Sequence, residues 1–405
     1  MKVLFVVFEF QTSVSGGVGR VINGLAPELA RSAPVHVLWV FGSRWHRRRF
    51  QLYELCPDGT PRKRGGPLLQ TPENVVRTVR QEGYDVVHCF CVHPVFTEML
   101  AALKARLPQV RLVFSVHNLL AHEQAVRTTT SALLQEERRT LELCDHLHVL
   151  NQAGLRYLSA SYPQLVARKP PTIISNGLAE QSFVARDEAL SKALAARTRG
   201  HAAVISCLSR WAPGKGLEVL ASAVQELLAE SDVCLVLAGR KRASWEVGSK
   251  QYVRHIDRCL RRLGRRAVVL GWLDEAQRNS LLDATDVCVM PSELEYFSYA
   301  SFEALHQGVP LVQSRLDCLV EVLRDGAHCV FFAPGDAGDL REKLGAVVAD
   351  GQRARAMAAR GRARVRELLR WGPIAEEYLA MYQGLFAPTS RPTRALCHES
   401  AAHLL

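Results

Sequence analysis

The chain has 405 residues, of which 48% are hydrophobic and 22% are charged. These values are typical of globular proteins and exclude a chain that is disordered throughout. The formal net charge of +11 favours anionic partners such as nucleotides, phosphosugars, acidic lipids or nucleic acid, although an arginine-rich composition without a binding role explains it equally well.

The first half of the chain alternates short apolar runs with helical patterns. A helical pattern opens at "SGGVGRV" (15–21), and Pro27 is expected to kink that helix. The segments 42–51 and 57–67 are polar and basic and predict long loops. Buried strands are predicted at 2–9, 34–40, 85–90, 110–116, 146–150 and 171–175.

The same alternation restarts after residues 178–200, where an amphipathic helix is predicted at 216–230. The second set of strands is predicted at 202–208, 232–239, 266–273, 286–292, 309–314 and 328–333. We therefore expect an α/β protein with two doubly wound, Rossmann-like parallel-sheet domains, 1–180 and 181–370, facing a central cleft. A helix at 371–387 follows, and residues 388–405 have no periodicity and are expected to be disordered.

Cysteine spacing and hydropathy limit the cellular compartments in which the protein is expected. Of eleven scattered cysteines only Cys89 and Cys91 lie close together, which predicts buried thiols in a reducing compartment and no zinc site. The apolar start is too short for a secretory leader, and no apolar run reaches the roughly 18 residues of a membrane span. We expect a cytoplasmic protein, with contact to the inner face of the membrane through the basic loops left open as an alternative.

The segment "SRWAPGKG" (209–216) lies between a predicted strand and a predicted helix. Arg210 and Lys215 share this turn, and Gly214 and Gly216 free its backbone. Two cations beside the bare amides of a helix start form an anion site, for which diphosphate is a natural ligand. An ordinary loop with solvated cations is the alternative.

Gly16 and Gly17 occupy a similar turn after the first strand. Paired glycines allow the backbone to approach a ligand closely, but their spacing does not match the dinucleotide-binding fingerprint. His88 and His117 lie at the ends of two later strands, where a histidine contacts substrate or packs in the core. Packing is the favoured interpretation for His88, and both interpretations stay open for His117.

The segment "SELEYFSYASFEALHQGVP" (292–310) contains two glutamates, one on each side of a helix start. Glu295 is expected on the loop after a strand and Glu303 just over one turn into the helix, with Ser298 as its N-cap. Carboxylates accept hydrogen bonds from vicinal hydroxyls, and bare amides hold phosphate or sugar oxygens. The segment therefore suits a sugar nucleotide, although an exposed helix glutamate is the simpler interpretation of Glu303 alone.

Taken in order, these segments resemble glycosyltransferase family 4, the retaining transferases of the GT-B fold. The resemblance spans nearly the whole chain and includes the family's pair of glutamates separated by seven residues. The segments that carry it are "GGVGRV", "YDVVHCF", "FSVHN", "ISNGL", "SRWAPGKGLEVLASAV", "LVLAGR", "LGWLDEAQRNSLLDATDVCVMPS" and "ELEYFSYASFEALHQGVPLVQS".

The resemblance implies a hexosyltransferase that uses a nucleoside-diphosphate sugar, such as a UDP sugar, and a hydroxyl acceptor, without a cofactor. It implies an acceptor-binding first domain, a donor-binding second domain and a last helix that crosses back to the first. The implied catalytic residues are His117, Glu295, Arg210 and Lys215. The implied binding residues are Arg210 and Lys215 for the diphosphate, Glu303 for the ribose, Glu295 for the sugar, the amides of Phe297, Ser298 and Tyr299 for sugar and phosphate, Gly16 and Gly17 for diphosphate or acceptor, and Trp272 and Leu273 for the base.

One departure from the family pattern is Tyr296, which stands where the commonest form has glycine and is expected near the donor sugar. The chain has no D-x-D, so a metal held by that motif is not expected. Three alternatives stay open: an epimerase of the same fold, a basic nucleic-acid-binding protein and an inactive sugar-binding partner. The base, the sugar, the acceptor, the linkage and the oligomeric state are not indicated by the sequence.

Overall fold

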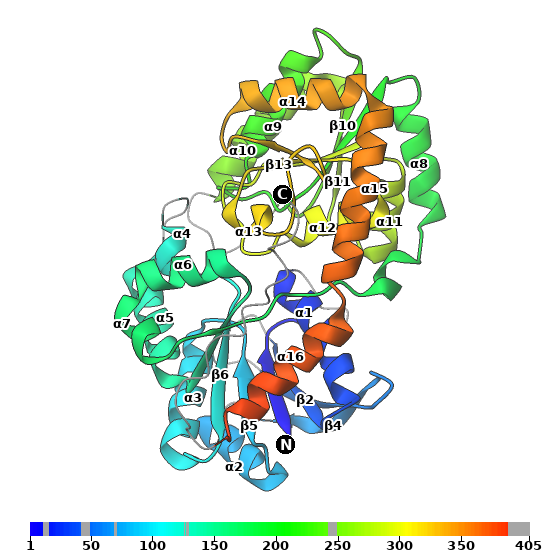
Figure 1. Cartoon of the computed structure of the whole chain (residues 1–405). Helices are drawn as coiled ribbons and strands as arrows, with labels where there is room; N and C mark the ends of the chain where they lie inside the picture. The colour runs from blue at the N-terminus through cyan, green and yellow to red at the C-terminus, as the bar shows by residue number, and fades with distance from the viewer. Residues whose placement is uncertain are drawn as a thin grey trace, which may run out of the picture.

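The computed structural model describes residues 1–10, 16–41, 49–68, 71–124, 126, 129–241 and 249–387. Within these residues two Rossmann-like α/β domains, each built on its own sheet, lie one above the other (Figure 1). Most of the segment 42–51 and the whole tail 388–405 fall outside the described residues. The exact domain boundaries stay predictions.

The first domain has a sheet in the order β4-β3-β2-β1-β5-β6-β7-β8. Its strands are β1 (Val3–Val7), β2 (Val35–Phe41), β3 (Arg49–Leu55), β4 (Pro61–Leu68), β5 (Val86–Cys89), β6 (Arg111–Val116), β7 (His146–Val149) and β8 (Thr172–Ile173). Its helices are α1 (Gly17–Ala30), α2 (Pro72–Glu82), α3 (Pro94–Arg106), α4 (Leu120–Glu123), α5 (Ser131–Leu143), α6 (Gln152–Ser161) and α7 (Pro163–Arg168). The helix predicted from residue 15 is α1, which continues through Pro27.

The prediction of a long loop at 57–67 is wrong, because β3 and β4 form an antiparallel hairpin at the edge of this sheet. In β3 the buried Phe50 and Leu52 flank Gln51, which is also buried, so this part of the strand is covered on both faces. In β4 the exposed Arg62, Lys63 and Arg64 follow one another on an edge strand, where charge is common. The basic composition therefore concealed a strand.

The second domain has a six-stranded parallel sheet in the order β11-β10-β9-β12-β13-β14. Its strands are β9 (Ala203–Leu208), β10 (Val233–Ala238), β11 (Ala267–Gly271), β12 (Val287–Met290), β13 (Leu311–Ser314) and β14 (Val330–Phe332). The surrounding helices are η2 (Glu180–Phe183), α8 (Glu188–Thr198), α9 (Leu217–Leu227), α10 (Ser249–Leu263), η3 (Gly264–Arg266), α11 (Glu275–Asp283), α12 (Tyr299–Gln307), α13 (Asp317–Val320), α14 (Ala337–Ala349) and α15 (Gly351–Leu368).

Both sheets reverse their strand order beside their first strand, between β1 and β5 and between β9 and β12. In open parallel sheets, ligands bind beyond the carboxyl ends of the strands at such switch points. The segments after β1 and β9 carry the glycine pair and the basic pair, and the loop after β12 carries Glu295, with Glu303 following in α12. The topology therefore positions the candidate residues at the ligand-binding ends of both sheets, and the register shifts of the sheets lie elsewhere, between β10 and β11 and between β3 and β4.

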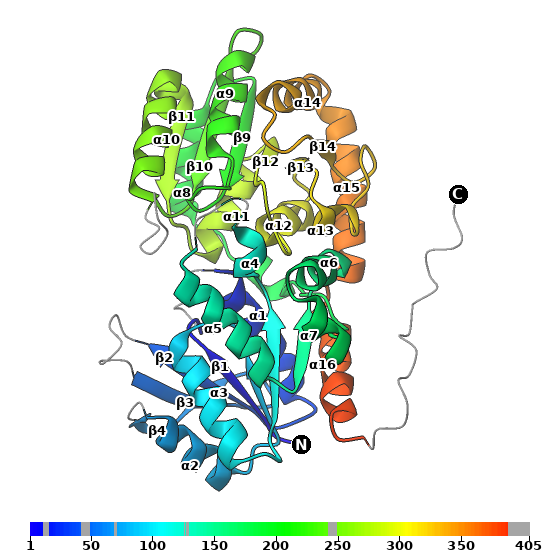
Figure 2. The same cartoon turned by 90° about the vertical axis from the view of Figure 1, so that its left-hand side faces the viewer.

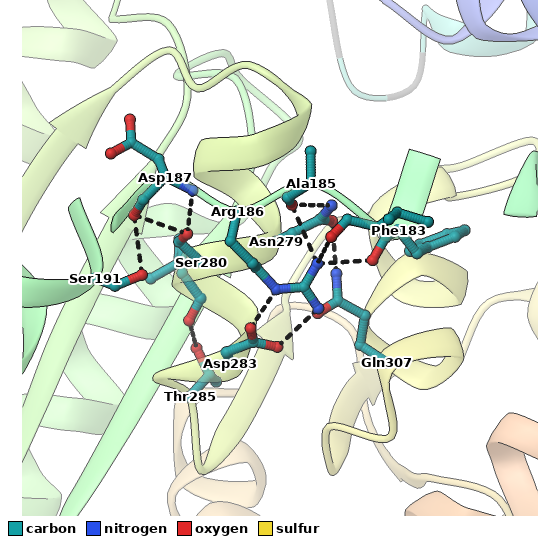
Figure 3. A network of polar contacts seen from close by, with 12 residues as sticks. Phe183, Ala185, Arg186, Asp187, Ser191, Asn279, Ser280, Asp283, Thr285 and Gln307 are labelled. Atoms are coloured by element: carbon teal, nitrogen blue, oxygen red, sulfur yellow. Dashed lines mark hydrogen bonds and ion pairs between the residues drawn. The ribbon is translucent and has the colours of Figure 1, made fainter. Parts of the chain in front are cut away.

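The link between the domains is tied to α11 by a polar network (Figure 3). The Asn279 side-chain amide donates to the carbonyls of Ser182 (2.8 Å) and Ala185 (3.0 Å), and Arg186 pairs with Asp283. Ser280 exchanges hydrogen bonds with the backbone of Asp187 at 2.8 and 3.1 Å. These contacts fix the position of α11 at the start of the second domain.

The last helix, α16 (Trp371–Gly384), leaves α15 and packs on the first domain beside α1 (Figure 1). Trp371, only 5% exposed, fills the space that Gly24 of α1 and Gly177 leave empty. A Cβ at Gly24 would lie 1.9 Å from the indole Nε1. Glycine is therefore required here for close packing.

A buried polar chain also connects α16 to the first sheet. His88 on β5 hydrogen-bonds the Tyr382 hydroxyl and the Ser115 hydroxyl, each at 2.7 Å. Ser115 in turn bonds Nδ1 of His148 at 2.6 Å, and the other ring nitrogen of His148 bonds the carbonyl of Ile174 at 2.8 Å. His88 is fully buried, which favours packing over substrate contact for this residue.

In the part of the chain that the structure describes, no helix has the length and apolar character needed to cross a bilayer.

Gly24→Ala is expected to lower the free energy of unfolding by about 1–3 kcal/mol, the usual cost of overpacking, because the new methyl group meets Trp371. Gly372→Ala is the matched control, since a Cβ there meets nothing within 4 Å and the substitution favours helix. Urea unfolding of both variants checks this. Equal stabilities of the two variants would show that the packing of Trp371 does not require glycine at position 24.

Stability is expected to fall as the pH drops below about 6.5, the pKa of histidine in an unfolded chain. Burial lowers the pKa of His148 to about 4 and that of His117 to about 3, and it lowers the pKa of His88 as well. Between the folded and unfolded values the unfolded state binds more protons, so each histidine costs roughly 1.4 kcal/mol per pH unit of acidification. Urea midpoints from pH 7.5 to 5 measure this, and a flat profile would contradict it.

Candidate active site

The loop after β9 carries the basic pair in a fixed shape. Gly216 has φ +62° and would place a Cβ 2.0 Å from the Pro291 carbonyl oxygen, so the loop lies directly against the loop after β12. Trp211 is fully buried and anchors the turn, while Arg210 beside it is exposed. Lys215 Nζ lies 2.6 Å from the Glu295 carboxylate. The structure thus brings two predicted residues into direct contact.

The loop after β12 leads into α12 through a left-handed residue. Ser298 has φ +59°, the one non-glycine residue with positive φ among those described. It occupies the N-cap position, but its hydroxyl bonds the Ser301 hydroxyl at 2.7 Å, and within the described chain no side chain caps the helix. Ser298 is therefore the N-cap residue, as predicted, but its side chain does not cap the helix. The first amides of α12 lack side-chain acceptors, and a helix N-terminus of this kind attracts anions.

The aromatic residues of this loop pack inward. Phe297 is 7% exposed and its ring contacts those of Tyr299 and Phe302, each with a centroid distance of 4.8 Å. These contacts hold the backbone of the loop in place. Only the amides of Phe297 and its neighbours are then suited to the predicted contact with a ligand.

Glu303 lies on α12 and is only 4% exposed, so it is not a surface glutamate. One carboxylate oxygen is 2.7 Å from Arg20 of α1, and the other is 3.3 Å from Nε of Arg278 on α11. The two arginines come from different domains. The carboxylate therefore lies at the boundary between the domains, in contact with a positive charge from each.

The glycine-rich turn of the first domain contacts the same region. A Cβ at Gly17 would lie 3.5 Å from the ring of Tyr299, which is on the second domain. The Gly16 and Gly19 amides donate to the Glu9 carboxylate at 3.0 and 3.1 Å. Glu9 therefore already occupies part of the helix start that the sequence suggested for a ligand.

His117 follows β6 at the same end of the first sheet. Its Nε2 is buried and has no hydrogen-bond partner among the described residues, although the residue as a whole is half-buried. Burial lowers the pKa of this histidine to about 3, with His148 adding to the effect. A neutral ring with an unused nitrogen can exchange a hydrogen bond with a hydroxyl at neutral pH.

Tyr296 lies in an aromatic cluster at the domain boundary. Its hydroxyl donates to the Leu119 carbonyl at 3.3 Å, and its ring meets Tyr157 and His122 edge-on. Its own carbonyl accepts from the Asn151 side chain at 2.7 Å. This packing against the first domain was not indicated by the sequence, and Figure 2 shows the elements α4 and α6 that supply it.

Trp272 and Leu273 follow β11 on the outer side of the second sheet. Trp272 is 47% exposed, and the Arg240 guanidinium lies 5.5 Å from its ring centroid. An exposed indole beside a cation offers a flat surface on which a base could stack. Trp272 and Leu273 follow the edge strand β11, whereas Lys215 and Glu295 follow the central strands β9 and β12.

Three charged residues of this region were not found from the sequence: Glu9, Arg20 and Arg278. One feature of the sequence could have indicated Arg278. It precedes the buried Leu281 and Leu282 by three and four residues and therefore lies on the buried face of α11. A charged residue at such a position implies a partner. Glu9 and Arg20 gave no comparable pattern.

Solved structures with this arrangement of domains are glycosyltransferases of the GT-B fold. Sucrose-phosphate synthase from Thermosynechococcus elongatus superposes with a TM-score of 0.72 at 20% identity, covering 95% of this chain and 99% of that one. HepE from Anabaena in complex with UDP and glucose gives 0.70 at 18% identity, covering 95% and 100%. At these identities the likeness establishes the fold, which is the GT-B fold expected from the sequence.

Family models identify the group. Residues 15–181 match the model for Glycosyltransferase Family 4, and residues 202–350 match the model for Glycosyl transferases group 1. The chain belongs to this family of glycosyltransferases. Similar sequences include alpha-maltose-1-phosphate synthase of Mycolicibacterium smegmatis (23% identity, 96% of this chain and 100% of the relative) and an uncharacterized glycosyltransferase of Methanocaldococcus jannaschii (21%, 95% and 98%).

Ser298→Gly is expected to change the free energy of unfolding by less than about 1 kcal/mol, because relief of the left-handed backbone offsets the lost bond to Ser301. Ser298→Val is expected to cost at least about 2 kcal/mol, since a β-branched side chain is strained at positive φ and the bond to Ser301 is lost, while Ser301 keeps its bond to Gln313. Urea unfolding compares the two variants. Equal stabilities would contradict the assigned backbone conformation.

Proposed function

We propose that the protein is a retaining hexosyltransferase that moves a sugar from a nucleoside-diphosphate donor to a hydroxyl acceptor. The observation that supports this most is the convergence of the loops after β9 and β12, with Lys215 and Glu295 2.6 Å apart. Cations, a carboxylate and an uncapped helix start then lie together at a switch point of the sheet. Such a mixture suits a ligand that carries both phosphates and hydroxyls.

In the proposed complex each part of the donor has its own partner. Arg210, Lys215 and the start of α12 hold the diphosphate, and Glu303 accepts hydrogen bonds from the ribose hydroxyls. Glu295 and the amides near Phe297 meet the sugar. Trp272 and Leu273 lie beside the base.

The first domain would supply the binding site for the acceptor. Gly17 faces Tyr299 across the domain boundary, and His117 keeps an unused nitrogen at the end of β6. We place the acceptor hydroxyl between these residues and the donor sugar. For a lipid-linked acceptor, the alternative is that the basic segments of the first domain contact a lipid surface.

The chemical step we propose is attack by the acceptor hydroxyl on the same face of the sugar that the diphosphate leaves. The new bond joins the acceptor oxygen to the anomeric carbon, the bond from that carbon to the phosphate oxygen breaks, and the hydroxyl proton passes to the departing phosphate. Arg210, Lys215 and the helix start stabilise the charge that develops on this phosphate, an effect of preorganised electrostatics. Glu295 stays paired with Lys215 and is not needed as a covalent nucleophile.

Names of the similar proteins support this choice of donor. HepE has been solved with UDP and glucose, and another similar chain, Starch Synthase IV from Arabidopsis thaliana, has been solved with ADP and acarbose. A uridine or adenosine diphosphate sugar is therefore the first donor to test. The two structures named here do not indicate a single acceptor.

Thermal unfolding with UDP, ADP, GDP and dTDP tests the donor class. A nucleotide at about 100 times its dissociation constant stabilises the protein by about 2.7 kcal/mol, and we expect that response from at least one of the four. With the matching sugar donor, Arg210→Ala should lower turnover by about 10²-fold, the loss typical of removing one charge-stabilising donor.

Arg199→Ala, an exposed arginine at the end of α8, is the control and should retain full turnover. Donor incubated without acceptor should stay unchanged, since an epimerase would alter the free sugar nucleotide. The anomeric configuration of the product, followed by NMR, tests retention. A flat thermal response to all four nucleotides would contradict the proposed function.

A further inference from the structure

Arg278 is a buried arginine that no part of the proposed reaction has used. Its side chain is 7% exposed, and the Glu303 side chain that it faces is 5% exposed. Burying a charge is costly unless it is paired, and removal of one partner of a buried pair typically costs 3–5 kcal/mol. A charge in this position therefore calls for an explanation beyond surface solvation.

The geometry of the pair is unusual for a structural ion pair. Arg278 Nε and Glu303 Oε2 lie 3.3 Å apart, but neither atom forms a hydrogen bond with any described residue. The two groups are close enough to share charge and are not aligned for a hydrogen bond. Oε2 is buried and therefore keeps an unused capacity to accept a hydrogen bond.

Helix α11 holds Arg278 in a fixed place. The next residue, Asn279, donates to two carbonyls of the domain link and accepts from Gln307 of α12 at 2.6 Å. Figure 3 shows these contacts together with the pair of Arg186 and Asp283. Since Gln307 lies one turn after Glu303, this bond fixes α11 and α12 relative to each other close to the ion pair.

Arg20, the other partner of Glu303, is placed differently. It comes from the first domain, its side chain is 31% exposed, and it contacts the opposite carboxylate oxygen. Any change in the relative position of the domains alters this contact. Arg278 belongs to the same domain as Glu303 and stays beside it in every arrangement of the domains.

We propose that Arg278 is a positioning residue that keeps the Glu303 carboxylate charged and aimed at the ribose of the donor, whether or not Arg20 is in contact. This inference rests on the proposed function, in which Glu303 accepts from the ribose hydroxyls. A charged carboxylate binds hydroxyls about twice as strongly as a neutral acid. Arg278 supplies a counter-charge to this buried carboxylate from within its own domain.

Few other titratable groups face this pair. Cys288 on β12 and Tyr299 on α12 interact with Glu303, and burial raises the pKa of both, so they stay neutral below pH 8. Glu275 and Asp274, at the start of α11, lie near Arg278. Arg20 and Arg278 are thus the cations beside Glu303 in the described structure.

The experiment measures nucleotide affinity by calorimetry from pH 5.5 to 8 for wild type, Arg278→Met and Arg278→Lys, using whichever of UDP, ADP, GDP and dTDP stabilises the wild type. Arg278→Met should weaken binding by at least about 10-fold, the factor that corresponds to a loss of 1.4 kcal/mol. Arg278→Lys should restore most of the affinity, and Arg199→Met serves as the surface control.

A double-mutant cycle with Glu303→Gln separates positioning from a general effect on folding. In the Glu303→Gln background Arg278→Met should weaken binding no further, because the charge that it supports is absent. With the sugar donor, the KM of Arg278→Met should rise while kcat changes little, as expected for lost ground-state binding. Replacing both partners also avoids an unpaired buried charge, so the double variant should fold.

Two outcomes would overturn the inference: an Arg278→Met variant with wild-type affinity at every pH, or an equal loss in the Glu303→Gln background. A wild type that binds none of the four nucleotides would instead contradict the proposed function itself, and the inference would fail with it. Urea unfolding of each variant shows whether lost affinity follows from lost structure.

Discussion

The buried carboxylate of Glu303 is the constraint around which the domain boundary is organised. An ionised carboxylate with 5% exposure needs positive charge, and the structure supplies it from α1 at 2.7 Å and from α11 at 3.3 Å. Each of these helices has its own reason to be there. Gly17 at the start of α1 lies beside Tyr299 of the second domain, and the network around Asn279 fixes α11 beside α12.

Other polar contacts across the boundary are weaker in kind. Arg156 of α6 reaches Asp317 and Glu321 at 3.2 and 3.3 Å, but both the arginine and Asp317 are more than half exposed, and exposed ion pairs contribute about 0–1 kcal/mol. The Tyr296 hydroxyl adds one bond to a carbonyl. These contacts can therefore break and reform at low cost when the domains move, whereas the contact between Arg20 and Glu303 involves a desolvated carboxylate.

The sequence predicted most of the fold because twelve apolar runs correspond to twelve of the strands found. It missed β3 and β4, whose basic edge positions resemble a loop. The sequence singled out Arg210, Lys215, Glu295 and Glu303 as candidates because the first three follow strand ends and Glu303 follows in the next helix, all in recognisable segments. Arg278 could not be assigned a role in the same way, because its partner lies 25 residues further on and is brought near only by the packing of α11 on α12.

The same reasoning explains why the donor could not be identified from side chains. Within the described residues Glu295 is already paired with Lys215, and Glu303 is already paired with Arg278. A diphosphate added to this site would depend strongly on the start of α12, which no described side chain caps, and backbone amides are the same whatever the residue. In the proposed complex the base and the sugar would then be distinguished by the shape of loops such as that around Phe297. Such shape depends on packing and backbone angles, including the left-handed Ser298, and those become visible only in the folded chain.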